Sequence, residues 1–297
     1  MNKQLISIWM QQIRAPFLVL SVVLVFLGIS AAAFDGHFSW LHSLLLLAGV
    51  VQTHISVNLF NELSDFNTEI DANSQRTPFS GGSGMMQAGL TNSNAVKWAG
   101  YVNMGVAGLI GFYFCIISSW WILGFMLLGG LAIRFYTTHF ARWLIGEFIA
   151  GLTLGSCVIM GVYLAVSGTL NWHVFFLSLP SGILTTQLLF LNEFPDADVD
   201  REGGRKHWVI FLGRRRSAIL YTVLMMLCYA TILAIPSLTK FPATVWLGLG
   251  TLPLAVMACR GALRYHSDFK RLVPAMGQNV LVVLLTNLLL GVGLIFA

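Results

Sequence analysis

The residues of this chain that could do chemistry are concentrated between Asn192 and Glu202, where five carboxylates fall within ten residues. Asn192, Asp196 and Asp200 are four residues apart, so on a helix they would lie along one stripe. Two carboxylates about 5.5 Å apart repel by roughly 3 kcal/mol at an effective dielectric of about 20. A divalent cation turns this repulsion into binding. Mg²⁺ is the candidate, because it takes oxygen ligands and shares them with phosphates.

A second acidic cluster repeats this pattern earlier in the chain. The pentapeptide Asn-Glu-x-x-Asp occurs at 61–65 and again at 192–196, each time directly after an apolar segment. Together the clusters contain nine of the twelve acids, namely Glu62, Asp65, Glu69, Asp71, Glu193, Asp196, Asp198, Asp200 and Glu202. This concentration favours two cation-binding clusters over solvated carboxylates at helix ends. Asp71 falls off the helical stripe of Asn61 and Asp65, so either the helix ends before it or it has another role. At Pro195 we expect a local break in the helix.

Basic and glycine-rich segments follow both clusters. Arg76 precedes the glycines of segment 80–84, and Arg205 and Lys206 follow Gly203-Gly204. Glycine-rich backbone can approach phosphate closely, and the Arg fork matches phosphate oxygens. Carboxylates that hold cations, together with Arg or Lys, are the parts of a metal diphosphate site. The alternative is that these cations only anchor the chain at the membrane surface, which we favour for segment 214–216.

The composition places these polar segments in a membrane protein. The chain of 297 residues is 57% hydrophobic and 10% charged, whereas ordinary soluble domains have about 25% charged residues. The four cysteines lie in apolar stretches without paired spacing, which predicts neither a disulfide framework nor a zinc site. The net charge of +5 reflects membrane topology and gives no indication of nucleic-acid binding.

The hydropathy pattern predicts an all-α fold, a bundle of nine transmembrane helices, since each span needs about 20 apolar residues. The predicted spans are 15–34, 39–60, 95–117, 119–137, 145–167, 172–193, 216–236, 243–262 and 273–296. We expect a single domain over 1–297, built from parallel pseudo-repeats at about 15–137 and 145–262 plus the ninth helix at 273–296. Cytoplasmic loops are expected to form a cap over a central cavity.

The distribution of basic residues predicts the orientation of the bundle. With a cytoplasmic N-terminus, nine spans place sixteen of the seventeen Lys and Arg inside and only Lys240 outside. The C-terminus would then lie outside. Because the two pentapeptides follow the second and sixth spans, both would open on the cytoplasmic face and could face each other across one cavity.

Other polar residues are candidates for the wall of this cavity. Asn58 lies just before the first pentapeptide, and Tyr136 and Arg142 flank the connection after the fourth span. Tyr136 could equally belong to an aromatic belt at the interface. Polar positions also occur inside spans two and six, at Gln52, His54, Thr185, Thr186 and Gln187. These side chains could line a pocket for a small polar head group or make interhelical hydrogen bonds.

These motifs resemble the UbiA-type superfamily of intramembrane aromatic prenyltransferases. The first motif of that family is usually Asn-Asp-x-x-Asp with a further Asp, which Asn61, Asp65 and Asp71 match while Glu62 replaces the usual Asp. The second is usually Asp-x-x-x-Asp with a basic, glycine-containing continuation, matched by Asp196, Asp200, Arg201, Gly204, Arg205, Lys206 and Gly213. Gly146-Glu147 is similar to a Gly-Glu pair of the family.

The resemblance implies a Mg²⁺-dependent enzyme that joins a polyprenyl diphosphate to a small aromatic acceptor and releases pyrophosphate. It implies an integral protein of a bacterial or archaeal inner membrane. The metal ligands would be Asn61, Asp65, Asp71, Asp196 and Asp200, with Asp65, Asp196 and Asp200 catalytic. Substrate-binding residues would be Asn58, Arg76, Tyr136, Arg142, Asn192, Arg205 and Lys206.

The spacing of the first motif indicates a subfamily. Asp71 lies ten residues after Asn61, which is similar to menaquinone-type enzymes that prenylate dihydroxynaphthoate, although segment 77–84 departs from their usual loop. Alternatives within the family are haem or chlorophyll prenyltransferases, lipid ether synthases and prenyl cyclases. The alternative from another class is an ion-coupled secondary transporter. Transporter sites usually lie near the bilayer midplane, whereas these acids lie at helix ends beside basic loops.

Overall fold

The computed structural model describes residues 3–68, 77–136 and 139–297. All regular elements in these ranges are helical, which confirms the all-α prediction for the described part of the chain. Asp71 and Arg76, two of the predicted site residues, lie outside the described residues.

Apart from residues 68–92, the connections between successive helices are short. The first part of the chain comprises α1 (Lys3–Gln12), η1 (Ala15–Leu18), α2 (Val19–Phe34), α3 (Trp40–Asn67), α5 (Ser93–Ile117) and α6 (Trp121–Phe135). The second part comprises η2 (Phe140–Arg142), α7 (Gly146–Ala150), η3 (Gly151–Ser156), α8 (Cys157–Ser167), α9 (Trp172–Glu202), α10 (Trp208–Leu212), α11 (Arg214–Leu238), η4 (Ala243–Thr251), α12 (Leu252–Tyr265) and α13 (Phe269–Ile295).

Eight helical segments in the described ranges are long and apolar enough to cross a membrane. They correspond to eight of the predicted spans. The predicted span 119–137 corresponds to α6, which has 15 residues. A helix of that length is about 22 Å long, less than the roughly 30 Å of a bilayer's hydrocarbon core. The chain is therefore an integral membrane protein with eight long apolar helices and one shorter apolar helix among its described residues.

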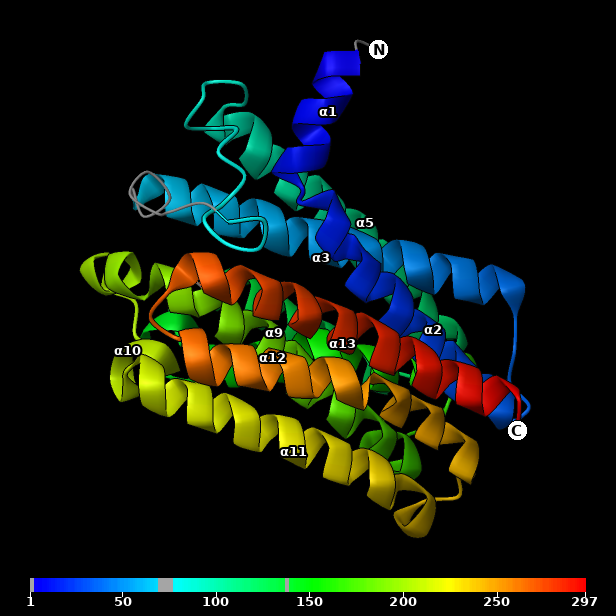
Figure 1. The fold of residues 1–297 in the computed structure, drawn as a ribbon. Helices are drawn as coiled ribbons and strands as arrows, with labels where there is room; N and C mark the ends of the chain where they lie inside the picture. The colour runs from blue at the N-terminus through cyan, green and yellow to red at the C-terminus, as the bar shows by residue number, and fades with distance from the viewer. Residues whose placement is uncertain (1–2, 69–76, 137–138) are drawn as a thin grey trace.

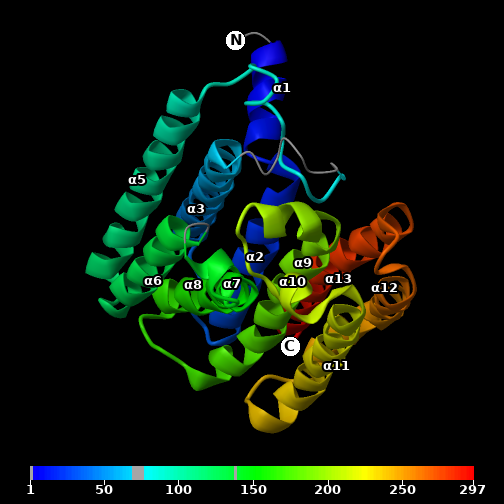
Figure 2. The ribbon, with the colours of Figure 1, turned by 90° about the vertical axis from the view of Figure 1, so that its left-hand side faces the viewer.

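The long helices lie side by side in one bundle, and α1 projects from it (Figure 1). Seen from the end, α3 and α5 form one side, α11, α12 and α13 form the other, and α2 and α9 lie between them (Figure 2). Contacts of α2 with α13, and of α9 with α11 and α13, hold the two sides together. This arrangement gives α9 neighbours on several sides.

Side-chain caps fix the start of four long helices. Ser39, Asn92, Asn171 and Asp268 each accept a hydrogen bond from a backbone N–H two or three residues later. Such caps satisfy a backbone donor that has no partner within the helix. Two of these helices are α3 and α9, so the caps help to set the registers in which the acids project.

Helices α3 and α9 both extend beyond their predicted spans and carry the acid clusters with them. The predicted spans ended at 60 and 193, whereas α3 continues to Asn67 and α9 to Glu202. The predicted break at Pro195 is wrong, since α9 runs through it without interruption. A proline removes one backbone hydrogen bond. Here Phe194, before the proline, and Ala197, after it, are both buried, so tertiary packing stabilises the helix on both sides.

Small residues bring α9 close to the helical segment that begins at Gly146. A Cβ atom on Gly155 of η3 would lie 2.7 Å from Gly182 Cα and 2.8 Å from the carbonyl oxygen of Ser181. Ser156 Oγ donates a hydrogen bond of 3.0 Å to the carbonyl oxygen of Ser178, across the same interface. This contact positions α9 against the segment that carries Glu147.

Candidate functional site

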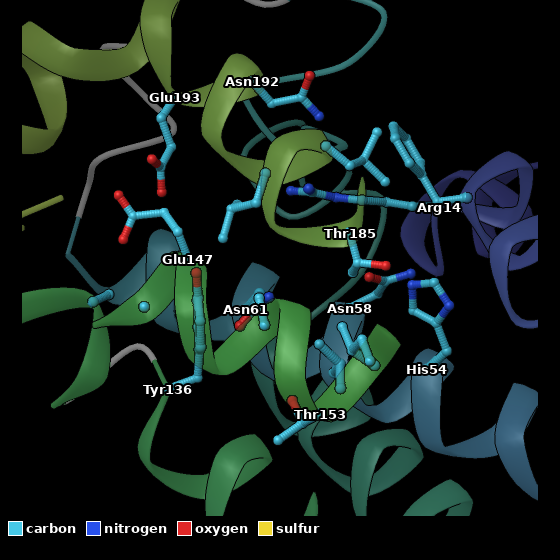
Figure 3. Close-up of a pocket in the computed structure, with 18 of the residues that line it drawn as sticks. Arg14, His54, Asn58, Asn61, Tyr136, Glu147, Thr153, Thr185, Asn192 and Glu193 are labelled. Carbon is cyan, nitrogen blue, oxygen red and sulfur yellow. The ribbon is translucent and has the colours of Figure 1, made fainter. Parts of the chain in front are cut away.

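A cavity of about 300 Å³ lies between the two acid-bearing helices, and Figure 3 shows residues from its wall. On α3 the lining residues run from Val50 through His54 and Asn58 to Asn61 and Asp65. On α9 they run from Thr185 and Leu188 through Asn192 to Asp196 and Asp200. Both stripes become acidic toward the C-terminal end of their helix, so one end of the cavity is polar and acidic.

Arg205 connects the two acid clusters. Its guanidinium pairs with Asp65 of α3 and, at 3.0 Å, with Oδ1 of Asp200 of α9. Burial alone lowers the pKa of Arg205, but the neighbouring carboxylates of Asp65 and Asp200 raise it more, and the net shift is upward. The guanidinium therefore stays charged and neutralises part of the acidic end.

The structure brings most of the predicted site residues together. Those that line the cavity are Asn58, Asn61, Asp65, Tyr136, Asn192, Asp196, Asp200 and Arg205. Arg142 and Lys206 are exposed and do not belong to the cavity wall. Lys206 contributes through its backbone instead, where its N–H donates to the carbonyl oxygen of Ala141 at 2.9 Å.

Glu62, which replaces the usual Asp of the first motif, does not face the cavity. Its fully buried carboxylate accepts hydrogen bonds from Arg14 Nε at 2.8 Å and Gln12 Nε2 at 3.3 Å. It also accepts from the backbone N–H of Ser83 at 2.7 Å and the Ser83 hydroxyl at 2.6 Å. Glu62 thus joins three segments: the N-terminal helix, α3 and the glycine-rich loop.

The glycine-rich loop forms part of the cavity wall through Phe79, Ser80, Gly81 and Gly82. Gly81 and Gly82 have φ angles of 84° and 68°, in the left-handed region that favours glycine. Two successive residues in this conformation explain why the sequence needs glycine here. The sequence analysis expected glycine-rich backbone to approach a phosphate, and this backbone lies in the wall of the cavity that contains the acids.

Polar residues inside the helices take both roles that the sequence left open. His54 and Thr185 line the cavity. His54 also joins two helices, through a hydrogen bond of 2.9 Å between its Nδ1 and Ser21 Oγ of α2. Thr186 Oγ1 donates to the carbonyl oxygen of Glu147 at 3.0 Å, and Gln187 Nε2 donates to that of Tyr221 at 2.7 Å. Thr186 and Gln187 therefore hold helices together.

Sequence reasoning did not assign several residues that the structure places in the cavity wall, among them Arg14, Glu147, Glu193 and His207. Glu147 belongs to the Gly-Glu pair and Glu193 to the second pentapeptide, so the sequence contained a signal for both as site residues. Arg14 reaches the site through a turn with φ of 51°, and His207 through the loop before α10. The sequence carries no spacing signal for either.

The donor set at the acidic end fits Mg²⁺. The side chains gathered there from both pentapeptides offer carboxylate and amide oxygens, which are the ligands of a hard divalent cation. Within the described ranges, the buried Oδ1 atom of Asn192 has no hydrogen-bond partner. A buried polar atom without a partner is costly and indicates a ligand at this position.

The family profile of the UbiA prenyltransferase family matches residues 21–293 of this chain. The chain belongs to the UbiA prenyltransferase family. It is 27% identical over 293 residues to the 1,4-dihydroxy-2-naphthoate octaprenyltransferase of Bacillus subtilis. The aligned region covers 97% of this chain and 92% of that protein. The resemblance stated from the two motifs is thereby confirmed.

Solved structures of UbiA homologues share the fold. The apo structure of a homologue from Aeropyrum pernix has a TM-score of 0.72 at 13% identity, covering 95% of this chain and 98% of that one. A homologue from Archaeoglobus fulgidus bound to DMAPP and Mg²⁺ has a TM-score of 0.59 at 12% identity, covering 97% and 99%. These likenesses support the arrangement of helices around the cavity.

Proposed function

We propose that this UbiA family member transfers a polyprenyl group from an allylic polyprenyl diphosphate to a hydroxylated naphthoate and releases pyrophosphate. The sequence offset between Asn61 and Asp71 favours a menaquinone-type acceptor. The named activity of the Bacillus subtilis relative, 1,4-dihydroxy-2-naphthoate octaprenyl transfer, supports the same acceptor class. The Archaeoglobus fulgidus homologue, bound to DMAPP and Mg²⁺, supports the donor class and the cation.

The observation that carries this proposal is the polarity of the cavity. Its acidic end gathers Asp65, Asp196 and Asp200 with Arg205, while the wall elsewhere includes apolar side chains such as Leu20, Val50, Val57, Leu154, Val158 and Leu188. An allylic diphosphate has the matching polarity, with a charged head and a hydrocarbon tail. A cavity of this kind can hold the head beside the acids and the reactive carbon next to an aromatic ring.

The site residues have distinct roles in this proposal. Asn61, Asp65, Asp196 and Asp200 hold Mg²⁺, with Asp71 as a further ligand and Arg76 as a cation near the diphosphate. Bound Mg²⁺ supplies positive charge that stabilises the departing pyrophosphate. Arg205 shares this task, since it is buried, charged and already placed between the acids. Asn58, Tyr136 and Asn192 line the space beside the head group.

The chemical step breaks the bond between the allylic carbon and the diphosphate oxygen, and the electron pair leaves with pyrophosphate. The electron-rich ring of the acceptor supplies the electron pair for the new carbon–carbon bond. The ring then loses the group that the new bond replaces, as a proton or as carbon dioxide. The negative charge of pyrophosphate must be stabilised during the whole step, and the cations at the acidic end of the cavity have this role.

The proposal includes an orientation in the membrane, with the N-terminus and the site loops in the cytoplasm and the C-terminus outside. The ion pair of 2.6 Å between Lys240 and Asp35 supports it, because both residues lie in connections that the topology places outside. The C-terminus lies at the end of the bundle away from α10 (Figure 1). The equivalent positions of the acids on α3 and α9 support two parallel pseudo-repeats, at about 15–137 and 145–262, with the ninth helix at 273–296. In this proposal α6 is the fourth of nine spans, and the loops form a cap.

The test uses purified protein in detergent with geranyl to longer prenyl diphosphates, a panel of aromatic acids and Mg²⁺, read by mass spectrometry. We expect product and pyrophosphate with a hydroxynaphthoate. Asp65→Asn or Asp196→Asn should abolish transfer while thermal unfolding stays cooperative, because each change removes a ligand charge without changing side-chain size.

The matched control is Glu202→Gln, which removes an exposed carboxylate from the end of the same helix. This variant should retain wild-type turnover. Wild-type turnover in Asp65→Asn or Asp196→Asn would overturn the site assignment. Ion-driven uptake into proteoliposomes without pyrophosphate release would instead favour a transporter.

A further inference from the structure

A second cluster of ionisable side chains lies in the cavity wall beside the aspartates. It consists of Glu147 on α7, Glu193 on α9 and His207 just before α10, and their ligand atoms lie within 4.8 Å of one another. Glu147 is fully buried, and the side chains of His207 and Glu193 are 3% and 12% exposed. Figure 3 shows the carboxylates of Glu147 and Glu193 pointing toward each other.

The two carboxylates lack the donors that their burial requires. Oε1 of Glu147 accepts a hydrogen bond of 2.6 Å from the backbone N–H of Trp208. Its other oxygen, Oε2, is buried without a hydrogen-bond partner in the described part of the chain, and so is Oε2 of Glu193. Two buried carboxylates that face each other need either a shared proton or a cation between them, and a cation also requires further ligands beside them.

The imidazole of His207 is oriented as a ligand toward this point. Its Nε2 lies 3.2 Å from Oδ2 of Asp200, and its Nδ1 lies 3.6 Å from Oε2 of Glu193. A separation of 3.6 Å is too long for a hydrogen bond. It is close to the roughly 3.4 Å expected between two ligands of one tetrahedral ion with bonds of about 2.1 Å. Asp200 stands where a carboxylate commonly orients a metal-binding histidine.

We propose that Glu147, Glu193 and His207 form a binding site for a divalent transition-metal ion such as Zn²⁺. Its ligand set is separate from the proposed Mg²⁺ ligands, Asn61, Asp65, Asp196 and Asp200. The imidazole nitrogen favours Zn²⁺ over Mg²⁺, which prefers oxygen. All three side chains line the cavity, so the fourth coordination position faces the space where an anionic substrate oxygen can bind.

The test measures metal binding directly and does not use the transferase reaction. Purified protein is freed of metal with a chelator and titrated with Co²⁺ in excess Mg²⁺ and without prenyl diphosphate. We expect one Co²⁺ per chain with the visible spectrum of a tetrahedral site, displaced by Zn²⁺. Glu147→Gln and His207→Asn should each weaken this binding by at least tenfold. Glu202→Gln, an exposed acid on the same helix as Glu193, should bind as the wild type does.

Two results would overturn the proposal. One is a wild-type protein whose bound Co²⁺ is fully displaced by excess Mg²⁺, or whose binding is unchanged in Glu147→Gln and His207→Asn. The other is an infrared band of a protonated carboxylic acid in the metal-free and Zn²⁺-treated protein alike that disappears in Glu193→Gln. That band would show that a shared proton takes the place of the cation. Thermal unfolding of each variant establishes that it is folded, and neither outcome bears on prenyl transfer.

Discussion

Arg205 forms an ion pair with Asp65, a residue 140 positions earlier in the chain. The same guanidinium reaches Asp200 with its other terminal nitrogen at 3.0 Å. One cation therefore joins the acidic ends of α3 and α9, and it does so inside the cavity. Because the pair is mostly buried, its charge is poorly screened by solvent, and each partner depends on the other.

Arg205→Gln should lower kcat/KM for the prenyl diphosphate by about 10- to 100-fold, because a hydrogen bond to a charged group contributes about 1.5–3 kcal/mol. The KM for the prenyl diphosphate should rise, since a cation for the diphosphate is lost. Arg205→Lys keeps the charge but not the forked guanidinium, so its kcat/KM should lie between those of the wild type and of Arg205→Gln. The measurement is steady-state kinetics at saturating Mg²⁺.

The control for this change is Arg215→Gln, which removes an exposed cation of α11 outside the cavity wall. It should leave kcat and KM within twofold of the wild type, as expected of a membrane anchor. If the Arg205 and Arg215 variants gave equal kinetics, Arg205 would have no part in diphosphate binding.

Arg142→Gln and Lys206→Gln test whether these two residues bind substrate, as the sequence predicted, or have no part in binding, as the geometry of the cavity indicates. Both residues were predicted to bind substrate, and both are exposed outside the cavity wall. If the described geometry holds during turnover, each variant should retain at least about half of the wild-type kcat/KM, because surface charges contribute little. A loss as large as that of Arg205→Gln would mean that these cations move to the diphosphate.

The helical stripes could be predicted from the sequence. Asn61 and Asp65, like Asn192, Asp196 and Asp200, have helical spacing, and the hydropathy pattern places both groups at helix ends. The positive-inside rule then predicts that both ends open on one face. This reasoning works because it needs only local periodicity and the length of each apolar segment.

Contacts made through loops and turns could not be predicted in this way. Arg14 meets Glu62 only because a residue with positive φ turns the chain after α1. His207 reaches Glu193 through the loop that follows α9. At Pro195 the rule that proline breaks a helix failed, since tertiary packing outweighed local propensity. Such contacts depend on the three-dimensional path of the chain, which spacing does not encode.

Glu62→Gln should destabilise the protein, because Arg14 would lose its counter-charge and Ser83 would lose one of its two acceptor oxygens. A hydrogen bond to a charged group contributes about 1.5–3 kcal/mol, and the 26% exposure of the Arg14 side chain favours the lower part of this range. Thermal unfolding in detergent measures the effect. Glu62→Asp is one methylene shorter and should lose the Ser83 contacts, which raises the KM for the prenyl diphosphate with a smaller loss of stability.

Glu202→Gln serves again as the control, since it removes an exposed carboxylate. It should unfold at the wild-type temperature. A Glu62→Gln protein as stable as this control, together with a Glu62→Asp protein of unchanged KM, would show that the glycine-rich loop does not depend on Glu62.

Gly155→Ala tests whether the close approach of η3 and α9 positions the site. The new Cβ would lie 2.7 Å from Gly182 Cα, so one of the two backbones must shift. Overpacking of this kind costs about 1–3 kcal/mol, and a shift of α9 also moves Asp196 and Asp200. We expect a lower unfolding temperature together with a lower kcat. Gly105→Ala on α5, where the added Cβ meets no atom within 4 Å, should lower neither, because alanine also has the higher helix propensity. Equal behaviour of the two variants would show that α9 has room to adjust and that the glycine contact does not set the position of its acids.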